Sequence, residues 1–101
     1  MPLQRPKYPK KDKNHRELVL SCQSYGIVVW DLSQLGGKVG DTIMFYGGKC
    51  LPVEIKDVGK RDELTDGEKE GLAECAAVGV DWVIAETVED VLRAFGMTEE
   101  M

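Results

Sequence analysis

The stretch DTIMFYGGKCLPVEIK, residues 41–56, consists of two runs of β-forming residues joined by a Gly-Gly pair. Such a pair between two β-runs predicts a hairpin with a two-residue loop. Counting outward from the loop in equal steps places Asp41 opposite Glu54, in the closer, non-hydrogen-bonded kind of pair, with Cα atoms roughly 4.5 Å apart. Because side chains alternate along a strand, Lys56 is expected on the same face as Glu54.

Two carboxylates that face each other across a sheet need a counter-ion, because like charges in that position are destabilising. They suit a hard divalent cation such as Mg²⁺, which accepts one or two protein carboxylates and keeps several waters. Such a cation lowers the pKa of a bound water and polarises a phosphoryl oxygen. Lys56 would then orient the water or neutralise the phosphate. An exposed acidic sheet end with an ordinary Glu-Lys contact is the alternative interpretation.

The residues around this pair resemble a known nuclease family. Gly40-Asp41 followed by Glu54-Ile55-Lys56 is similar to the signature of the PD-(D/E)xK nuclease superfamily. Four ordered segments resemble the small stand-alone VRR-NUC (virus-type replication-repair nuclease) proteins of phages and prophages, namely residues 31–41, 53–57, 64–68 and 86–92. The resemblance runs from about residue 12 to residue 96 and implies a restriction-endonuclease-like α/β fold with a mixed sheet flanked by helices.

A Mg²⁺- or Mn²⁺-dependent DNA endonuclease is the activity that this resemblance implies. Asp41 and Glu54 would bind the metal, the backbone carbonyl of Ile55 would add a third oxygen, and Lys56 would assist the attacking water. Glu17 in the first helix is a further candidate metal ligand. The candidate DNA-contacting residues, in the first helix, the loop before Asp41 and the later helix, are His15, Arg16, Ser33, Gln34, Lys38 and Lys69.

The partners follow from the resemblance alone. Stand-alone relatives are expected to act as homodimers on branched DNA, such as four-way (Holliday) junctions, where two sites related by a two-fold axis would suit paired nicks. Trp30, Tyr46 and Trp82 are large enough to anchor a dimer interface. The expected location is the cytoplasm of a bacterium, which is the host cell where the protein is encoded by a phage.

Two departures from the family pattern favour a different function. The family usually has Pro where this chain has Gly40, and many members have Gln in the helix after Glu-x-Lys, where this chain offers Glu68, Lys69 and Glu70. Lys69 is the nearest replacement for that Gln. The alternatives are a catalytically inactive DNA-binding or protein-interaction module that keeps the fold, and an acidic protein that mimics DNA. Retention of all three core residues favours the active nuclease.

Charge is distributed unevenly along the 101 residues, whose net charge is −5. Residues 1–16 hold six basic side chains and one acidic one, and the remainder is strongly acidic. The expected organisation is a flexible basic arm at 1–11, a single nuclease domain at 12–96 and a short tail at 97–101. The arm is expected either to grip a DNA backbone or to be a solubilising tail.

Cysteine spacing and hydropathy exclude several other classes. Three cysteines without C-x-x-C spacing and a single His argue against a zinc site or a disulfide framework, and instead favour buried, reduced thiols. No apolar run approaches the ~20 residues that span a bilayer, and no apolar segment follows the basic N-terminus as in a secretory signal.

The remaining elements complete an α-β-β-β-α-β-α order. A capping box at Thr65 and Glu68 predicts the start of the second helix, and Asp12 or Asn14 is expected to cap the first. The strand–helix–strand spacing predicts a parallel crossover beside the Glu54 strand. Apolar residues on both hairpin faces predict a sheet covered on both sides. A glycine loop at 36–40 is expected to let DNA approach, with Lys38 available for a phosphate.

Overall fold

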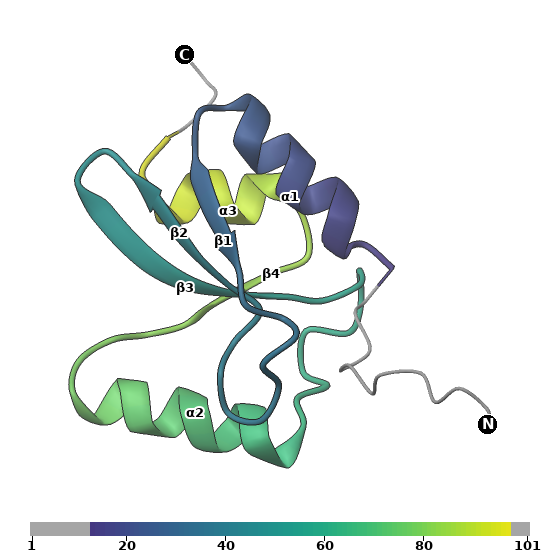
Figure 1. Cartoon of the computed structure of the whole chain (residues 1–101), viewed down its shortest axis with the longest axis vertical. Helices are drawn as coiled ribbons and strands as arrows, with labels where there is room; N and C mark the ends of the chain where they lie inside the picture. The colour runs from purple at the N-terminus through teal and green to yellow at the C-terminus, as the bar shows by residue number, and fades with distance from the viewer. Residues whose placement is uncertain (1–12, 98–101) are drawn as a thin grey trace, which may run out of the picture.

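Three helices and a four-stranded sheet make up the computed structural model, which describes residues 13–97. In chain order they are α1 His15–Ser24, β1 Val28–Asp31, β2 Thr42–Tyr46, β3 Lys49–Ile55, α2 Asp66–Ala77, β4 Val83–Ala85 and α3 Val88–Ala94 (Figure 1). The predicted element order is therefore confirmed, and the protein is a small α/β protein with a mixed sheet. The predicted basic arm at 1–11 and the tail after residue 97 lie outside the described residues.

The β2–β3 hairpin has the predicted register. Tyr46 pairs with Lys49 beside the turn, and the antiparallel ladder continues outward to Thr42 and Val53. Gly47 and Gly48 have φ angles of 60° and 81°, which suits a turn that requires positive φ at both central residues. The next pair outward along this register is Asp41 and Glu54.

The sheet has the order β1-β2-β3-β4. β1 is antiparallel to β2, while β4 is parallel to β3. The parallel crossover predicted from the strand–helix–strand spacing is thus confirmed, and α2 lies within the connection. Since β4 ends beside the end of β3, the segments that follow both strands leave the sheet at the same place.

The hydrophobic core lies between one face of the sheet and the helices α1 and α3. α1 packs against β1 and α3, and α3 also packs against β4. The side chains that fill this layer are Leu18, Cys22, Ile27, Met44, Val53, Ile55, Ala85, Val91, Leu92 and Phe95. In the part of the chain that the structure describes, no helix combines the length and apolar character that a membrane span needs.

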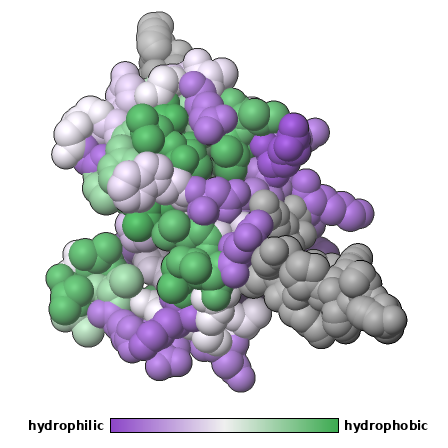
Figure 2. Space-filling view, in the orientation of Figure 1, coloured by the Kyte–Doolittle hydropathy of each residue, from purple (hydrophilic) through white to green (hydrophobic). Residues whose placement is uncertain are grey.

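The opposite face of the sheet is open, so the expectation of a sheet covered on both sides was wrong. Val28 and Trp30 on β1 are 54% and 58% exposed. Hydrophobic residues reach the molecular surface among polar ones (Figure 2). α2 does not cover this face but lies at the other end of the molecule from α1 and α3 (Figure 1). Its only buried residue is Gly71, so α2 has no wide apolar stripe with which to cover a sheet.

The open face also accounts for one cysteine. Cys22 is buried in the core, but Cys50 is exposed because it shares the open face with its β2 partner Phe45. The expectation that the thiols are buried is therefore wrong for Cys50. Burial raises the pKa of the Cys22 thiol to about 11, which makes that thiol a poor nucleophile.

α2 is held against the loop that connects β1 and β2. A Cβ atom on Gly67 would lie 2.6 Å from the carbonyl oxygen of Gly37, and one on Gly71 would overlap the carbonyl oxygen of Lys38. Lys38 Nζ also lies 2.7 Å from Glu74 Oε2. Glycines on α2 therefore allow the backbone of the 36–40 loop to approach the helix closely.

Gly71→Ala is expected to lower the free energy of unfolding. The overlap with the Lys38 carbonyl should outweigh the roughly 1 kcal/mol that Ala gains over Gly within a helix, for a net loss of at least about 1 kcal/mol. Urea unfolding followed by circular dichroism measures the change. Gly40→Ala is the matched control, because its Cβ would lie at an ordinary 3.6 Å from Glu54 Oε1 and the Trp82 ring. Equal stability of the two variants would contradict the close packing of α2 on the loop.

Candidate functional site

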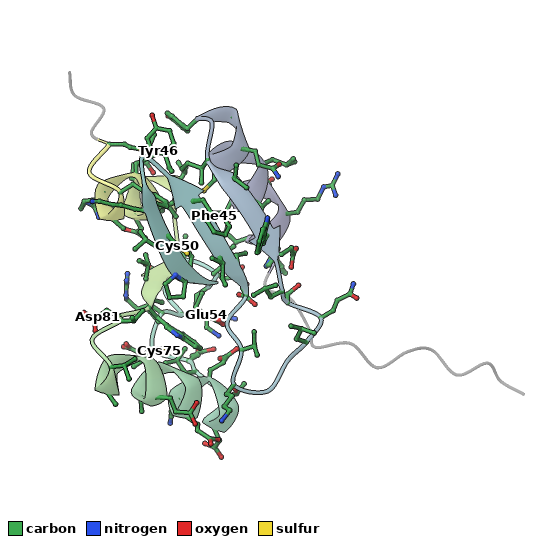
Figure 3. All side chains as sticks on the ribbon, turned by 60° about the vertical axis from the view of Figure 1, so that its left-hand side comes forward. Phe45, Tyr46, Cys50, Glu54, Cys75 and Asp81 are labelled. Atoms are coloured by element: carbon green, nitrogen blue, oxygen red, sulfur yellow. The ribbon has the colours of Figure 1, made fainter. Side chains whose placement is uncertain are left out.

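Charged side chains from three segments meet where the β2–β3 ladder ends. Asp41 directly precedes β2, Glu54 lies near the end of β3, Lys56 follows β3, and Glu68 lies in the first turn of α2. Figure 3 shows Glu54 in the region between the sheet and α2. Glu54 is 2% exposed and Lys56 is 8% exposed. Charged groups that are this buried need partners.

The two predicted metal ligands are linked to each other's strands. The backbone N–H of Asp41 donates a hydrogen bond to Glu54 Oε1 at 3.1 Å. Asp41 Oδ2 in turn accepts a hydrogen bond from the Ile55 N–H at 2.9 Å. Each carboxylate thus accepts a hydrogen bond from a backbone N–H of the opposite segment, just beyond the last paired residues of the ladder. The group of Ile55 that contacts Asp41 is its N–H.

Lys56 lies between two carboxylates from different elements. Its Nζ is 3.4 Å from Glu54 Oε2 and 3.2 Å from Glu68 Oε1. The predicted placement of Lys56 beside Glu54 therefore agrees with these contacts. The structure adds Glu68, which the sequence analysis named as a helix cap and near the position of the family's Gln but did not place in the site. Asp41, Glu54, Lys56 and Glu68 are called the acidic site below.

The carboxyl groups of the acidic site differ in their affinity for protons. Burial, followed by the charge of Asp41 and the contact with Glu68, raises the pKa of Glu54 to about 8. Burial also raises the pKa of Asp41, against the opposing effects of the Ile55 N–H and the charges of His15 and Lys56. For Glu68, burial is outweighed by hydrogen bonds from Glu54, the Thr65 N–H and Lys56, so its pKa is lowered. Of these groups, Glu54 therefore has the strongest tendency to hold a proton, whereas Glu68 favours the ionised form.

His15 is 2% exposed and lies close enough to Asp41 for its charge to lower the pKa of that carboxyl. Its Nε2 is 3.0 Å from Asp31 Oδ2, and Asp31 Oδ1 accepts hydrogen bonds from the Ser33 N–H at 2.9 Å and the Ser33 hydroxyl at 2.6 Å. Burial raises the pKa of Asp31, but the bonds from Ser33 and His15 outweigh it and hold that pKa below its usual range. Among the described residues, His15 Nδ1 is buried without a hydrogen-bond partner.

Asn14 fixes the start of α1 to the ends of two strands. Its side-chain amide donates to the carbonyl of Lys56 at 3.1 Å and to the carbonyl of Glu86 at 2.7 Å, and its N–H donates to Asp57 Oδ1 at 2.8 Å. The expectation that Asn14 caps α1 with its side chain was wrong, since no such bond forms. The amide is used for contacts with β3 and β4 instead, and these contacts bring His15 beside the acidic site.

The structure does not bring Glu17 to the acidic site. It is exposed on α1 and lines a surface pocket with Thr87 and Val88 at the start of α3. Lys69 is exposed on α2, while the neighbouring Glu68 faces Lys56. The sequence analysis had preferred Lys69 as the replacement for the family's Gln. It had assigned Glu68 to the capping box of α2.

The contacts of the other candidate DNA-contacting residues are with residues outside the acidic site. Ser33 is buried and its hydroxyl is bonded to Asp31. Lys38 is paired with Glu74 and lies 3.8 Å from Glu70, and these contacts raise its pKa. Gln34 and Arg16 are exposed in pockets on either side of Asp31. Asp31 is the first residue of one of the segments that resemble the nuclease family, but the sequence analysis gave it no role in the site.

A pocket of about 300 Å³ opens beside the acidic site, between the 32–40 loop, the open face of the sheet and α2. Its lining is mostly apolar and includes Leu32, Ile43, Pro52 and Trp82. The Trp82 indole N–H donates to Cys75 Sγ at 3.3 Å. Gly40 separates the pocket from Glu54, since a Cβ on Gly40 would touch both Glu54 and the Trp82 ring.

The donors that could hold a metal ion are Asp41 and Glu54. Within residues 13–97, no group of three or more His, Cys, Asp or Glu side chains is arranged as a metal site. Mg²⁺ requires only one or two protein carboxylates and completes its shell with water, so the donor set fits this ion. Comparisons of the chain with protein-family models, with curated proteins and with solved structures found no match.

Proposed function

We propose that the protein is a metal-dependent endonuclease that hydrolyses phosphodiester bonds in DNA, with the restriction-endonuclease-like arrangement of the PD-(D/E)xK nucleases. The observation that carries the proposal is the interlocking of Asp41 and Glu54 across the end of the hairpin, with Lys56 Nζ 3.4 Å from Glu54. Two neighbouring carboxylates with a lysine suit the cleavage of a phosphate ester, where negative charge builds on the phosphoryl oxygens.

The residues of the acidic site have separate roles in this proposal. Asp41 and Glu54 would hold Mg²⁺ or Mn²⁺, with the Ile55 carbonyl as the expected third oxygen. The bound ion supplies Lewis acidity and a water of lowered pKa. Glu54 gives up its proton on binding, because metal ligands must be deprotonated. Lys56 would donate a hydrogen bond to the phosphate while the water oxygen bonds to phosphorus and the bond to the leaving oxygen breaks, with the water losing a proton to solvent and the leaving oxygen taking one up from solvent.

Branched DNA and a second copy of the chain are the proposed partners, and both rest on the family resemblance. The open face of the sheet supports a dimer, since Trp30 is exposed there and stacks edge-on against Phe45 at a centroid distance of 4.8 Å. The Trp82 indole is partly buried and lies near Gly40 and Gly71. Light scattering of the wild type and of Trp30→Ser measures whether this face holds two copies together.

Cleavage assays test the catalytic proposal. Labelled four-way junction, flap, single-stranded and duplex DNA are incubated with the protein and Mg²⁺, Mn²⁺ or EDTA. We expect cleavage of the junction that requires metal and falls at least about 100-fold in Asp41→Asn and in Lys56→Ala, with the circular dichroism spectra unchanged. Glu89→Gln, an exposed change on α3, should cleave like the wild type. Cleavage in EDTA, or full activity of Asp41→Asn, would contradict the mechanism.

A non-catalytic DNA-binding module is the second candidate. The observation that favours it is that the Lys56 ammonium already contacts Glu54 and Glu68 inside the protein, as in an ion-pair network whose role is structural. Such a module would bind junction DNA with equal affinity in the presence of Mg²⁺ and EDTA and would leave the DNA intact. Electrophoretic mobility shifts performed alongside the cleavage assay distinguish this outcome.

A further inference from the structure

The Lys56 ammonium has two acidic neighbours that differ in where they come from. Glu54 lies two residues earlier on the same strand, whereas Glu68 belongs to α2. The contact with Glu68 Oε1 is the shorter one, at 3.2 Å against 3.4 Å to Glu54 Oε2.

Glu68 is itself held in place by the backbone at the start of α2. Its Oε1 accepts the N–H of Thr65 at 2.9 Å, and its own N–H donates to Thr65 Oγ1 at 3.0 Å. These two bonds form a capping box, which fixes the side chain relative to the helix. The same oxygen also accepts from Lys56, so the position of the Lys56 ammonium depends on where α2 lies.

The position of α2 is in turn set by the loop that leads into Asp41. Gly67 and Gly71 pack on the backbone of Gly37 and Lys38, and Lys38 pairs with Glu74. A continuous set of contacts therefore runs from Asp41 through this loop and α2 to Glu68. The positions of Asp41 and Lys56 therefore both depend on the packing of the 36–40 loop against α2.

We propose that Glu68 is a positioning residue that holds the Lys56 ammonium beside Glu54 and keeps it there when a divalent cation binds Asp41 and Glu54. This inference rests on the proposed nuclease function and assigns a further residue to the same site. Without Glu68, Lys56 would still pair with Glu54 and would compete with the cation for that carboxylate. With Glu68, Lys56 stays near the site of cleavage while Glu54 is released to the metal.

The substitution Glu68→Gln separates this role from helix capping. Gln at this position can still accept the Thr65 N–H, as in other capping boxes, but it carries no charge to hold an ammonium. Glu68→Ala loses both functions. Glu70→Gln is the matched control, because it makes the same change two residues along α2, where the carboxylate is exposed and 3.8 Å from Lys38.

The first measurement needs neither metal nor DNA. Urea unfolding in EDTA gives the stability of the wild type, Glu68→Gln, Lys56→Met and the double variant. We expect the two changes to be non-additive, and we expect Glu70→Gln and Lys56→Met to be additive. Additive effects of Glu68→Gln and Lys56→Met would overturn the positioning role while leaving the nuclease proposal intact.

The second measurement follows the metal. The Mn²⁺ concentration that gives half of the maximal rise in melting temperature should increase about 5-fold or more in Glu68→Gln and less than about 2-fold in Glu70→Gln. At saturating Mn²⁺, cleavage of junction DNA by Glu68→Gln should have a lower kcat and an unchanged KM. Metal binding and cleavage like those of the wild type would overturn the proposal. A wild type that neither binds metal nor cleaves DNA would overturn the proposed function, and with it the positioning role of Glu68 in the nuclease site, even where the unfolding measurements show coupling.

Discussion

Glu54→Gln should make the metal-free protein more stable in alkaline solution, although it removes a ligand of the proposed metal. The Glu54 side chain is almost fully buried and faces the charge of Asp41. Gln has the shape of a protonated Glu and can still accept the Asp41 N–H. The variant therefore keeps the contacts of the neutral side chain and cannot acquire the buried charge.

The sign of the pH dependence follows from the raised pKa of Glu54. Folding moves this pKa from 4.5 to about 8, so the folded protein binds a proton that the unfolded chain has released. The contribution of Glu54 to stability is therefore fully present below its unfolded pKa and is lost as the pH rises through its folded pKa. We expect Glu54→Gln to gain roughly 1–4 kcal/mol over the wild type at pH 9 and nearly nothing at pH 4.5.

Urea unfolding in EDTA at intervals between pH 4.5 and pH 9 measures this difference. Asp31 and Asp90 have lowered pKa values, so their contributions to stability are lost as the pH falls, but neither group is perturbed by Glu54, and their titrations cancel in the comparison. Glu89→Gln on the exposed side of α3 is the control and should show a constant, small difference. A gain in Glu54→Gln that does not grow with pH would mean that Glu54 is ionised throughout.

A gain in stability from this change bears directly on function. Buried charged groups that oppose folding are found mostly where activity requires them. If Gln is the more stable choice at position 54, packing alone does not explain Glu there. The combination of higher stability and lost cleavage in one variant would separate the nuclease proposal from the interpretation of the acidic site as a structural ion-pair network.

The hairpin and its acidic pair were predictable because the signals are local. Two glycines fix the loop, the loop fixes the register, and the register places Asp41 against Glu54 by counting. The observed ladder follows the same count out to Thr42 and Val53. No contact with a distant part of the chain is needed for this inference.

The position of α2 was not predictable in the same way. Both faces of the hairpin carry apolar side chains, which suggested helices on both faces, yet α2 lies beyond the strand ends (Figure 1). Its docking depends on Gly67 and Gly71, whose small size allows the 36–40 loop to approach. A glycine in a helix gives no signal of which backbone it will contact, so the open face of the sheet could not be read from the pattern.

The partners of the acidic site also depend on tertiary structure. His15 reaches the site because Asn14 attaches the start of α1 to the ends of β3 and β4, and that attachment has no sequence signature. Glu68 was assigned as a capping residue, and it is one, but the same oxygen also holds Lys56. The capping contact joins residues three apart and is visible in the sequence, whereas the contact with Lys56 joins α2 to the end of β3 and depends on the tertiary structure.

Lys56→Met is expected to have the largest combined effect on stability and activity. Methionine keeps most of the buried stem but removes the only ammonium that the structure shows between Glu54 and Glu68 within residues 13–97. At pH 6, where Glu54 is protonated, the loss is chiefly the pairing with Glu68, about 1–2 kcal/mol. At pH 9, ionised Glu54 would be left buried without a cation, and the loss should reach roughly 3–5 kcal/mol. Junction cleavage should fall at least about 100-fold at either pH.

A double variant shows which carboxylate is responsible. Glu54→Gln in the Lys56→Met background should restore most of the stability lost at pH 9, because it removes the charge that lacks a partner, but it should not restore cleavage. Lys60→Met, an exposed lysine in the 57–63 loop, controls for the removal of a positive charge. Recovery of stability without recovery of activity would place Lys56 in both networks, one that neutralises Glu54 in the folded protein and one that acts on the phosphate. If Lys56→Met were equally destabilising at pH 6 and pH 9, ionised Glu54 would not depend on Lys56 for its neutralisation.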